Sequence, residues 1–133
     1  MPETSAAGVC LLGGRLTKMN YASLAERIIE NGAYASGNGG LSMSKLRGVY
    51  ALITNVYSRI HSQADFENYC SDLQYVKVKM AYESGRDRVV GDFIKKTCLM
   101  SAIDDVETYE QFILYCRYAE SLVAYFKFYG GRD

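Results

Sequence analysis

The chain contains one proline, Pro2, and the lack of internal proline constrains its fold more than any other feature of the sequence. Proline breaks helices because it has no backbone N–H to donate and its ring clashes with the preceding turn. The 133 residues can therefore be helical over almost their whole length. A chain of this size predicts one domain, which can bury a core without disulfides or a metal.

Two central segments carry helical periodicity. Ser42 is a suitable N-cap for a helix over residues 43–60, where apolar residues recur at steps of three and four. A second apolar seam of this kind starts near Asp65 and runs to Met80. Residues 75–80 also alternate as a strand would, but no turn residues bracket them, so a helix is the preferred interpretation.

The last third of the chain predicts a long helix at the centre of the fold. Gly85 is expected to end or bend the preceding helix, and residues 86–98 to continue it or begin another. The acids of residues 104–107 (DDVE) have the spacing of a helix N-terminus. From there to Phe128 the chain is apolar on almost every side, as in a helix with partners around it. The prediction is an all-α bundle of about five helices with a long central C-terminal helix.

The N-terminal part differs in composition from the rest. Residues 1–40 are expected to form a flexible lead, with a short helix at about 16–30 and a glycine-rich loop over 31–40. Residues 41–133 are then the helical bundle domain. No apolar run reaches the roughly 18 residues needed to cross a bilayer, and no basic segment precedes an apolar core at the N-terminus. A cytoplasmic protein with no membrane partner is expected.

The cysteines and the single histidine do not form a metal or redox motif. The four cysteines lie far apart without a CxxC pair, and His61 has no cysteine or histidine nearby in the sequence. We therefore expect no metal, no cofactor and no catalytic residues, with thiols that are reduced and mostly buried.

The charges are balanced overall but unevenly placed. Fifteen basic and fifteen acidic residues give no net charge, so bulk charge does not argue for a nucleic-acid partner. Between residues 41 and 96, however, nine basic residues accompany six acidic ones. The chain is therefore polarised along its sequence.

Four side chains with helical spacing suggest a binding face. Tyr75, Lys79, Tyr82 and Arg86 follow one another at steps of four, three and four, which places them on one side of a helix. Cations suit phosphates and flat rings suit bases, so this pattern is typical of single-stranded nucleic-acid binding. The alternative is a second packed face, with the tyrosines buried and the cations extending to water.

Further basic residues are candidates for the same role. Lys45 and Arg47 lie in the first turn of a predicted helix, where they and its N–H groups could hold phosphate oxygens, or they belong to an ordinary solvated surface. Arg86 and Arg88 flank Asp87, which suggests either a phosphate clamp or a local salt bridge.

Three segments together resemble one known family. They are residues 41–50 (LSMSKLRGVY), 79–87 (KMAYESGRD) and 118–131 (YAESLVAYFKFYGG). In this order they are similar to the small subunit of the Csm effector complex, the type III-A CRISPR–Cas machine. The glycine-rich loop before Leu41 departs from the family pattern.

The resemblance implies a non-catalytic subunit. Members are small helical bundles that stack in several copies within a ribonucleoprotein and line the channel where target RNA pairs with guide RNA. They contribute basic residues to the RNA backbone, and other subunits cleave. Matching positions are Lys45, Arg47, Lys79, Arg86 and Arg88. With the resemblance, the RNA-facing interpretation of Lys79 and Arg86 is preferred over the packed one.

Two other functions stay open. The chain could be a helical adaptor that binds only protein through its aromatic C-terminal helix. A hydrolase using His61 and a cysteine is the least supported, because no glycine-rich turn for a nucleophile lies beside that histidine.

Overall fold

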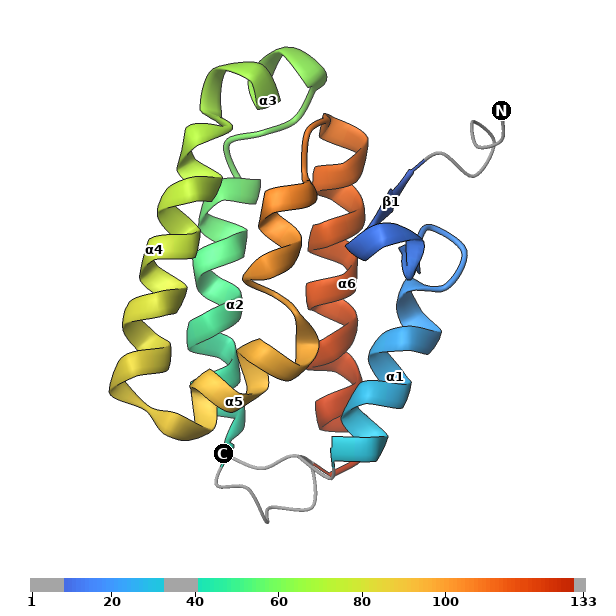
Figure 1. Ribbon diagram of the computed structural model, residues 1–133, viewed down its shortest axis with the longest axis vertical. Coiled ribbons are helices and arrows are strands. Elements are labelled where there is room, and N and C mark those ends of the chain that lie inside the picture. The colour runs from blue at the N-terminus through green and yellow to red at the C-terminus, as the bar shows by residue number, and fades with distance from the viewer. Residues whose placement is uncertain (1–8, 33–40, 131–133) are drawn as a thin grey trace.

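Helices account for most of the computed structural model, which describes residues 9–32 and 41–130. This confirms the prediction of an all-α fold (Figure 1). The six α-helices of these residues are α1 (Tyr21–Gly32), α2 (Met43–Tyr57), α3 (Gln63–Tyr69), α4 (Ser71–Arg86), α5 (Arg88–Thr97) and α6 (Tyr109–Phe128). Two short 3₁₀ turns, Leu12–Gly14 and Ser101–Asp105 (η4), and a two-stranded antiparallel sheet of β1 (Cys10–Leu11) and β2 (Leu16–Thr17) complete the fold. Within this part of the chain, none of the helices combines the length and apolarity that crossing a bilayer requires.

Helix α2 forms as its sequence predicts. Ser42 caps it, and the hydroxyl accepts a hydrogen bond from the Lys45 backbone N–H at 3.1 Å. The residues at three- and four-residue steps are buried: Met43, Leu46, Val49, Ile53 and Val56. The helix ends at Tyr57, earlier than expected, but Ile60 still packs into the core from the turn that follows.

The ambiguous segment over residues 75–80 is helical. It lies within α4, whose Leu73, Val76 and Met80 are buried at helical spacing. Helix α4 ends at Arg86. Asp87 then caps α5 by accepting hydrogen bonds from the backbone N–H groups of its first turn. Helices α4 and α5 are therefore separate elements joined by one residue.

Helix α6 is the central helix of the bundle, and its start differs from the prediction. Asp104 forms an ion pair with Lys77 at 2.7 Å, and Asp105 accepts a backbone N–H from the N-terminal turn. The true cap is Thr108, whose hydroxyl and the Gln111 side chain form a reciprocal capping box. Asp104 and Asp105 therefore serve tertiary contacts instead of starting the helix.

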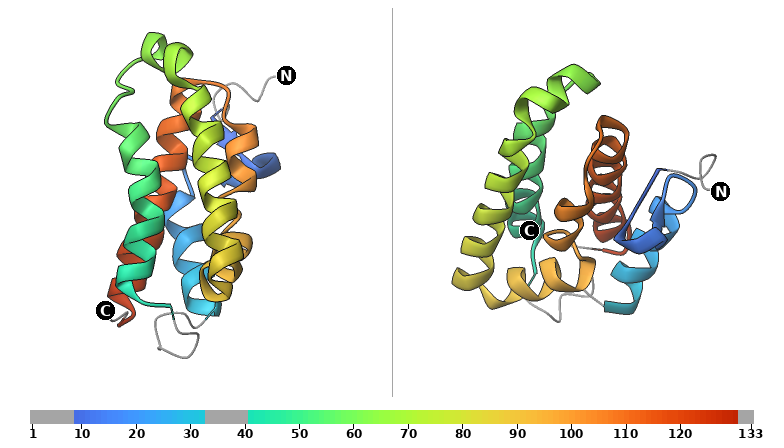
Figure 2. Two further views of the ribbon diagram at one scale, coloured as in Figure 1. Left: turned by 90° about the vertical axis from the view of Figure 1, so that its left-hand side faces the viewer. Right: turned by 45° about the horizontal axis from the view of Figure 1, so that its top comes forward.

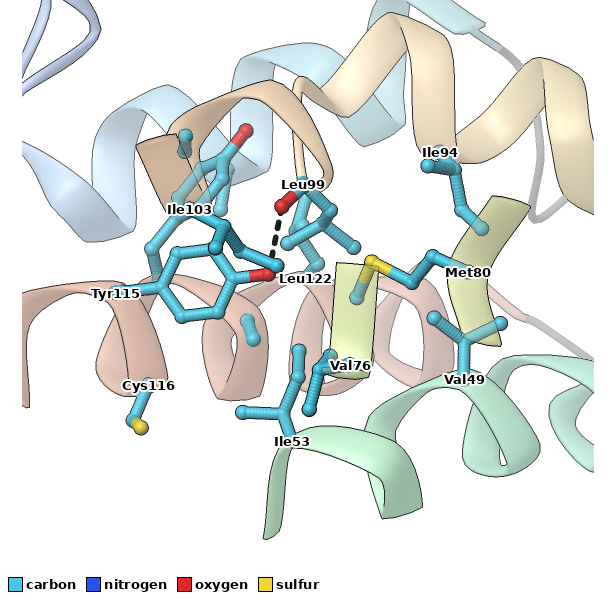
Figure 3. Packing of buried hydrophobic residues seen from close by; sticks show 14 of the residues in the cluster. Val49, Ile53, Val76, Met80, Ile94, Leu99, Ile103, Tyr115, Cys116 and Leu122 are labelled. Atoms are coloured by element: carbon cyan, nitrogen blue, oxygen red, sulfur yellow. Dashed lines mark hydrogen bonds between the residues drawn. The ribbon is translucent and has the colours of Figure 1, made fainter. Parts of the chain in front are cut away.

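The buried tyrosines of α6 tie it to the end of α5. Tyr115 donates its hydroxyl to the Leu99 carbonyl at 2.6 Å, and Tyr118 donates to the Thr97 carbonyl at 2.7 Å. Figure 3 shows the first of these bonds among the packed side chains. Between the two carbonyls Cys98 adopts a left-handed backbone conformation with φ +62°, and its N–H bonds back to the last turn of α5. Each tyrosine thus satisfies a carbonyl that the reversing chain leaves without a helical partner.

The N-terminal residues join the same core, although the sequence suggested a loose lead. Leu16 lies in β2, and the helix expected over 16–30 begins only at Tyr21. Helix α1 packs along α6 and buries Ala25 and Ile29, while Leu11 and Leu16 close the end of that contact. The sparse apolar spacing that predicts this helix is sufficient for packing because α6 supplies the complementary face. Most of the expected glycine-rich loop lies outside the described residues.

The crossing of α4 and α5 depends on a glycine. A Cβ added at Gly91 would lie 2.9 Å from the Ser84 carbonyl oxygen. We therefore expect Gly91→Ala to lower the free energy of unfolding by about 1–3 kcal/mol, because backbone must move to admit the methyl group. Gly48, with nothing within 4 Å of its added Cβ, is the matched control: Gly48→Ala should stabilise α2 by about 0.5–1 kcal/mol. Urea denaturation of both variants tests the prediction, and equal effects would contradict the close crossing.

Candidate nucleic-acid interface

The four side chains with helical spacing lie together on the outer face of α4. Tyr75 and Tyr82 are 60% and 66% exposed, and Lys79 and Arg86 are exposed as well. The Lys79 ammonium lies 4.9 Å from the centre of the Tyr75 ring, and the Arg86 guanidinium carbon 5.8 Å from that of Tyr82. Each cation is thus attracted to the face of a ring one turn earlier in the helix. The alternative of a second packed face is wrong, because none of the four is buried.

A groove runs between this face and α2, which lies beside α4 (Figure 1). One hollow of about 450 Å³ lies between Leu52 of α2 and the exposed side chains of α4. A second, of about 310 Å³, continues toward the start of α2 and shares Leu52 and Glu83 with the first. We call this the α2–α4 groove; its basic and aromatic residues are Lys45, Tyr75, Lys79, Tyr82 and Arg86.

Two of the cations in the groove already have acidic neighbours. Arg86 donates to Glu83 at 2.8 Å, and Lys45 lies 3.0 Å from Asp87. Hydrogen bonding from Lys45 lowers the pKa of Asp87, and the backbone N–H groups of α5 act in the same direction, so this carboxylate stays charged. Asp87 therefore caps α5 and pairs with Lys45, instead of bracing Arg86 and Arg88 as a clamp. Such exposed pairs contribute little to stability, and a phosphate can replace the carboxylate.

The structure gathers only part of the predicted basic set. Arg47 follows Lys45 by two residues, which is about 200° around a helix, so it lies on the opposite side of α2 from the groove. Arg88 is exposed in the first turn of α5 and does not line the groove. Lys79 differs from Lys45 and Arg86 because it has no ion pair within residues 9–32 and 41–130.

The other reactive side chains stand apart. The exposed His61 has its Nε2 atom 2.9 Å from the Ser58 carbonyl oxygen. Of the four thiols, Cys116 is buried, and this burial with the nearby Glu120 raises its pKa well above the usual range, which keeps it protonated. Cys70, by contrast, is exposed, so the expectation of mostly buried thiols is only partly met. No group of three potential metal ligands occurs in the described part of the chain.

A second surface was not predicted from the sequence. Hollows of about 610, 410 and 390 Å³ meet at the exposed Arg117 of α6. Tyrosines from the start of α1, from α2 and from both ends of α6 surround it: Tyr21, Tyr50, Tyr57, Tyr109 and Tyr125. We call this the Arg117 surface. Its residues come from three separate helices and from the segment before α1 (Val9, Lys18 and Met19), so the high tyrosine content was its one signal in the sequence.

Comparison with known proteins gives one consistent family. The family model described as Csm2 type III-A matches residues 18–132. A Streptococcus thermophilus protein named "CRISPR system Cms protein Csm2" is 37% identical over 123 residues, covering 89% of this chain and 98% of its own. A protein of the same name from Enterococcus italicus is 37% identical over 131 residues, covering 87% of this chain and 91% of its own. The resemblance found in three short segments is thus confirmed over almost the whole chain, which belongs to the Csm2 family of type III-A CRISPR systems.

Proposed function

We propose that this chain is a non-catalytic small subunit of a type III-A CRISPR effector complex and contacts the RNA backbone through the α2–α4 groove. Membership of the Csm2 family supports the place in such a complex. The groove supports the RNA contact, with Lys79 and Arg86 meeting phosphates while Tyr75 and Tyr82 offer flat faces to bases or riboses. Guide and target RNA are the proposed ligands, and other subunits of the complex, including further copies of this chain, are the proposed protein partners.

The single observation that carries the RNA contact is the repeated ring–cation pair on α4. Tyr75 with Lys79 and Tyr82 with Arg86 recur after seven residues, or about 10.5 Å along the helix. Both pairs are exposed on the same side of one helix. A row of cations that touches successive points of a polyanion suits backbone contacts, and base pairing between guide and target would supply the sequence specificity.

The low net charge agrees with a subunit that has one polyanion-binding face. Away from the groove, exposed cations and anions alternate, as in the ion pairs of Arg59 with Asp72 and Lys96 with Asp92. A subunit surrounded by protein on its other faces must not repel these neighbours. Local basic character on α4 is therefore compatible with a chain whose formal net charge is zero.

Removing both cations of the repeated ring–cation pair tests the RNA contact. We expect Lys79→Ala/Arg86→Ala to weaken binding of a fluorescent 20-nucleotide single-stranded RNA at least about tenfold, since two charge-assisted contacts are lost. The slope of log affinity against log salt should also fall by about 1.4, at about 0.7 for each phosphate. Fluorescence anisotropy over a salt series measures both quantities.

The matched control removes the same charge elsewhere. Arg27 and Lys127 are exposed on α1 and α6, and α1 lies on the opposite side of the bundle from α4 (Figure 2). Arg27→Ala/Lys127→Ala should leave the slope as in the unaltered protein. If both double variants weakened binding equally, the effect would be one of total charge, and the groove would have no special role.

An adaptor that binds only protein remains the second candidate function, and the aromatic Arg117 surface is the observation that favours it. The two functions differ in their dependence on RNA. An adaptor would be recovered with the other subunits in unchanged amount after nuclease treatment, and the unaltered protein would show no salt-dependent RNA binding.

A further inference from the structure

We infer that the Arg117 surface docks a segment of a different protein subunit, and that this segment presents an acidic side chain beside an apolar one. This inference rests on the proposed place of the chain in a multisubunit complex. It does not depend on the RNA contact, because the surface involves α1, α2 and α6 but not α4.

The shape of the surface fits a protein ligand. The three hollows are continuous: the first shares Tyr57 and Ile113 with the second and Tyr21 with the third, and all three share Arg117. They follow the junctions of α6 with α2 on one side and with the start of α1 on the other. An anchor side chain could enter at Arg117 while the rest of its segment lies along the helices.

The chemistry of the surface is that of an interface centre. Tyrosine, methionine and arginine are enriched at such centres, because they supply large contact areas that tolerate loss of water. Around Arg117, Tyr57 is 46% exposed and Met19 is 84% exposed. The Tyr57 ring packs against Phe112 on one side, and its exposed part and the Met19 thioether are available to a partner.

The charge of Arg117 defines what the partner must carry. No ion pair joins it to any residue in 9–32 or 41–130, although Glu120 lies one turn away on the same helix. If a partner covered this guanidinium without a carboxylate, a charge would be buried without compensation, which is strongly unfavourable. A docking segment must therefore bring an aspartate or glutamate to the centre of its apolar contact.

Two acidic residues argue against RNA at this surface. Glu110 lines the first hollow together with Lys18, and Glu120 lines the second and third. These two acids offset the two cations, Lys18 and Arg117, so the surface as a whole does not attract a polyanion. A protein segment with a single carboxylate needs only the guanidinium of Arg117.

A second copy of this chain also fits poorly. Among the described residues, Tyr75, Val78 and Tyr82 form a group of exposed apolar side chains on α4, and Lys79 lies among them. Docked here, that group would set a cation against Arg117 where a carboxylate is needed. The observations therefore favour a foreign segment.

Crosslinking within the assembled complex tests the identity of the occupant. The full chain with p-benzoylphenylalanine in place of Tyr57 is produced with the other subunits of its own effector complex and irradiated after purification. We expect a crosslink to another protein subunit, at a peptide with an acidic residue next to an apolar one. A crosslink to RNA or to a second copy, or no crosslink at all, would overturn the inference.

Charge reversal tests the role of Arg117. We expect Arg117→Glu to reduce the amount of this chain recovered through a tag on another subunit at least tenfold, whereas Arg27→Glu, an equal change on the exposed side of α1, should not. An acid-to-arginine change in the crosslinked segment should restore recovery of the Arg117→Glu chain. Failure of that rescue, or equal loss with Arg27→Glu, would contradict the pairing. RNA binding by isolated Arg117→Glu should be unchanged, which separates this outcome from failure of the RNA contact.

Discussion

Replacing Phe112 by alanine should lower the free energy of unfolding by about 3–5 kcal/mol, a large part of the stability of a domain of this size. Phe112 in the first turns of α6 is fully buried. Its ring centre lies 6.2 Å from that of Tyr57 on α2 and 6.2 Å from that of Phe66 on α3. Its removal would leave a cavity where three helices meet, and the surrounding rings could fill it only partly.

Phe128 provides the matched control on the same helix. It is 73% exposed and forms edge-to-face ring pairs with Tyr125 and Tyr129, so Phe128→Ala should cost under about 1 kcal/mol. Urea denaturation followed by far-ultraviolet circular dichroism compares the two variants. Similar midpoints for both would show that Phe112 does not hold the three helices together.

Alkaline pH should destabilise the protein steeply through Tyr115 and Tyr118. Burial raises the pKa of both hydroxyls well above the ordinary value of 10.0, so the folded protein keeps protons that the unfolded chain releases. Below about pH 10 both states are protonated and the contribution is complete. Above it, the free energy of unfolding should fall by about 1.4 kcal/mol per pH unit for each tyrosine, until the raised pKa of the folded state is reached.

The double variant Tyr115→Phe/Tyr118→Phe separates the two roles of these hydroxyls. At neutral pH it should be less stable by about 1–3 kcal/mol for each residue, because the carbonyls of Leu99 and Thr97 lose their donors. Between pH 10 and 11.5 its stability should decline less steeply than that of the unaltered protein. Urea denaturation across this range measures the slopes, with Tyr75→Phe on the surface as control. Parallel slopes would mean that other groups cause alkaline unfolding.

The sequence predicts those elements whose signals are local. Helix α2 and its Ser42 cap follow from adjacent residues, and the same holds for the exposed row from Tyr75 to Arg86, since helical spacing alone places it on one side of α4. Residues 75–80 are helical despite their strand-like alternation, because the apolar residues at three- and four-residue steps are the ones that pack into the core.

What the sequence could not predict depends on contacts between distant segments. Asp104 and Asp105 have the spacing of a helix N-terminus in the sequence. In the structure, however, Asp104 pairs with Lys77 and Asp105 accepts a backbone N–H from the N-terminal turn, and Thr108 is the N-cap of α6. The two-residue strands carry too little pattern to be recognised. By contrast, the separation of Lys45 and Arg47 to opposite sides of α2 follows from helical spacing alone and could have been predicted.

The left-handed residue that closes α5 has a practical consequence for labelling experiments. Cys70 is an exposed thiol suited to a fluorophore, and a singly labelled protein requires the other cysteines to be replaced. At position 98, where the backbone has φ +62°, serine, the customary substitute, keeps the strain that cysteine already bears. Asparagine or glycine visits that conformation routinely, so either should preserve the reversal of the chain beneath Tyr115 and Tyr118.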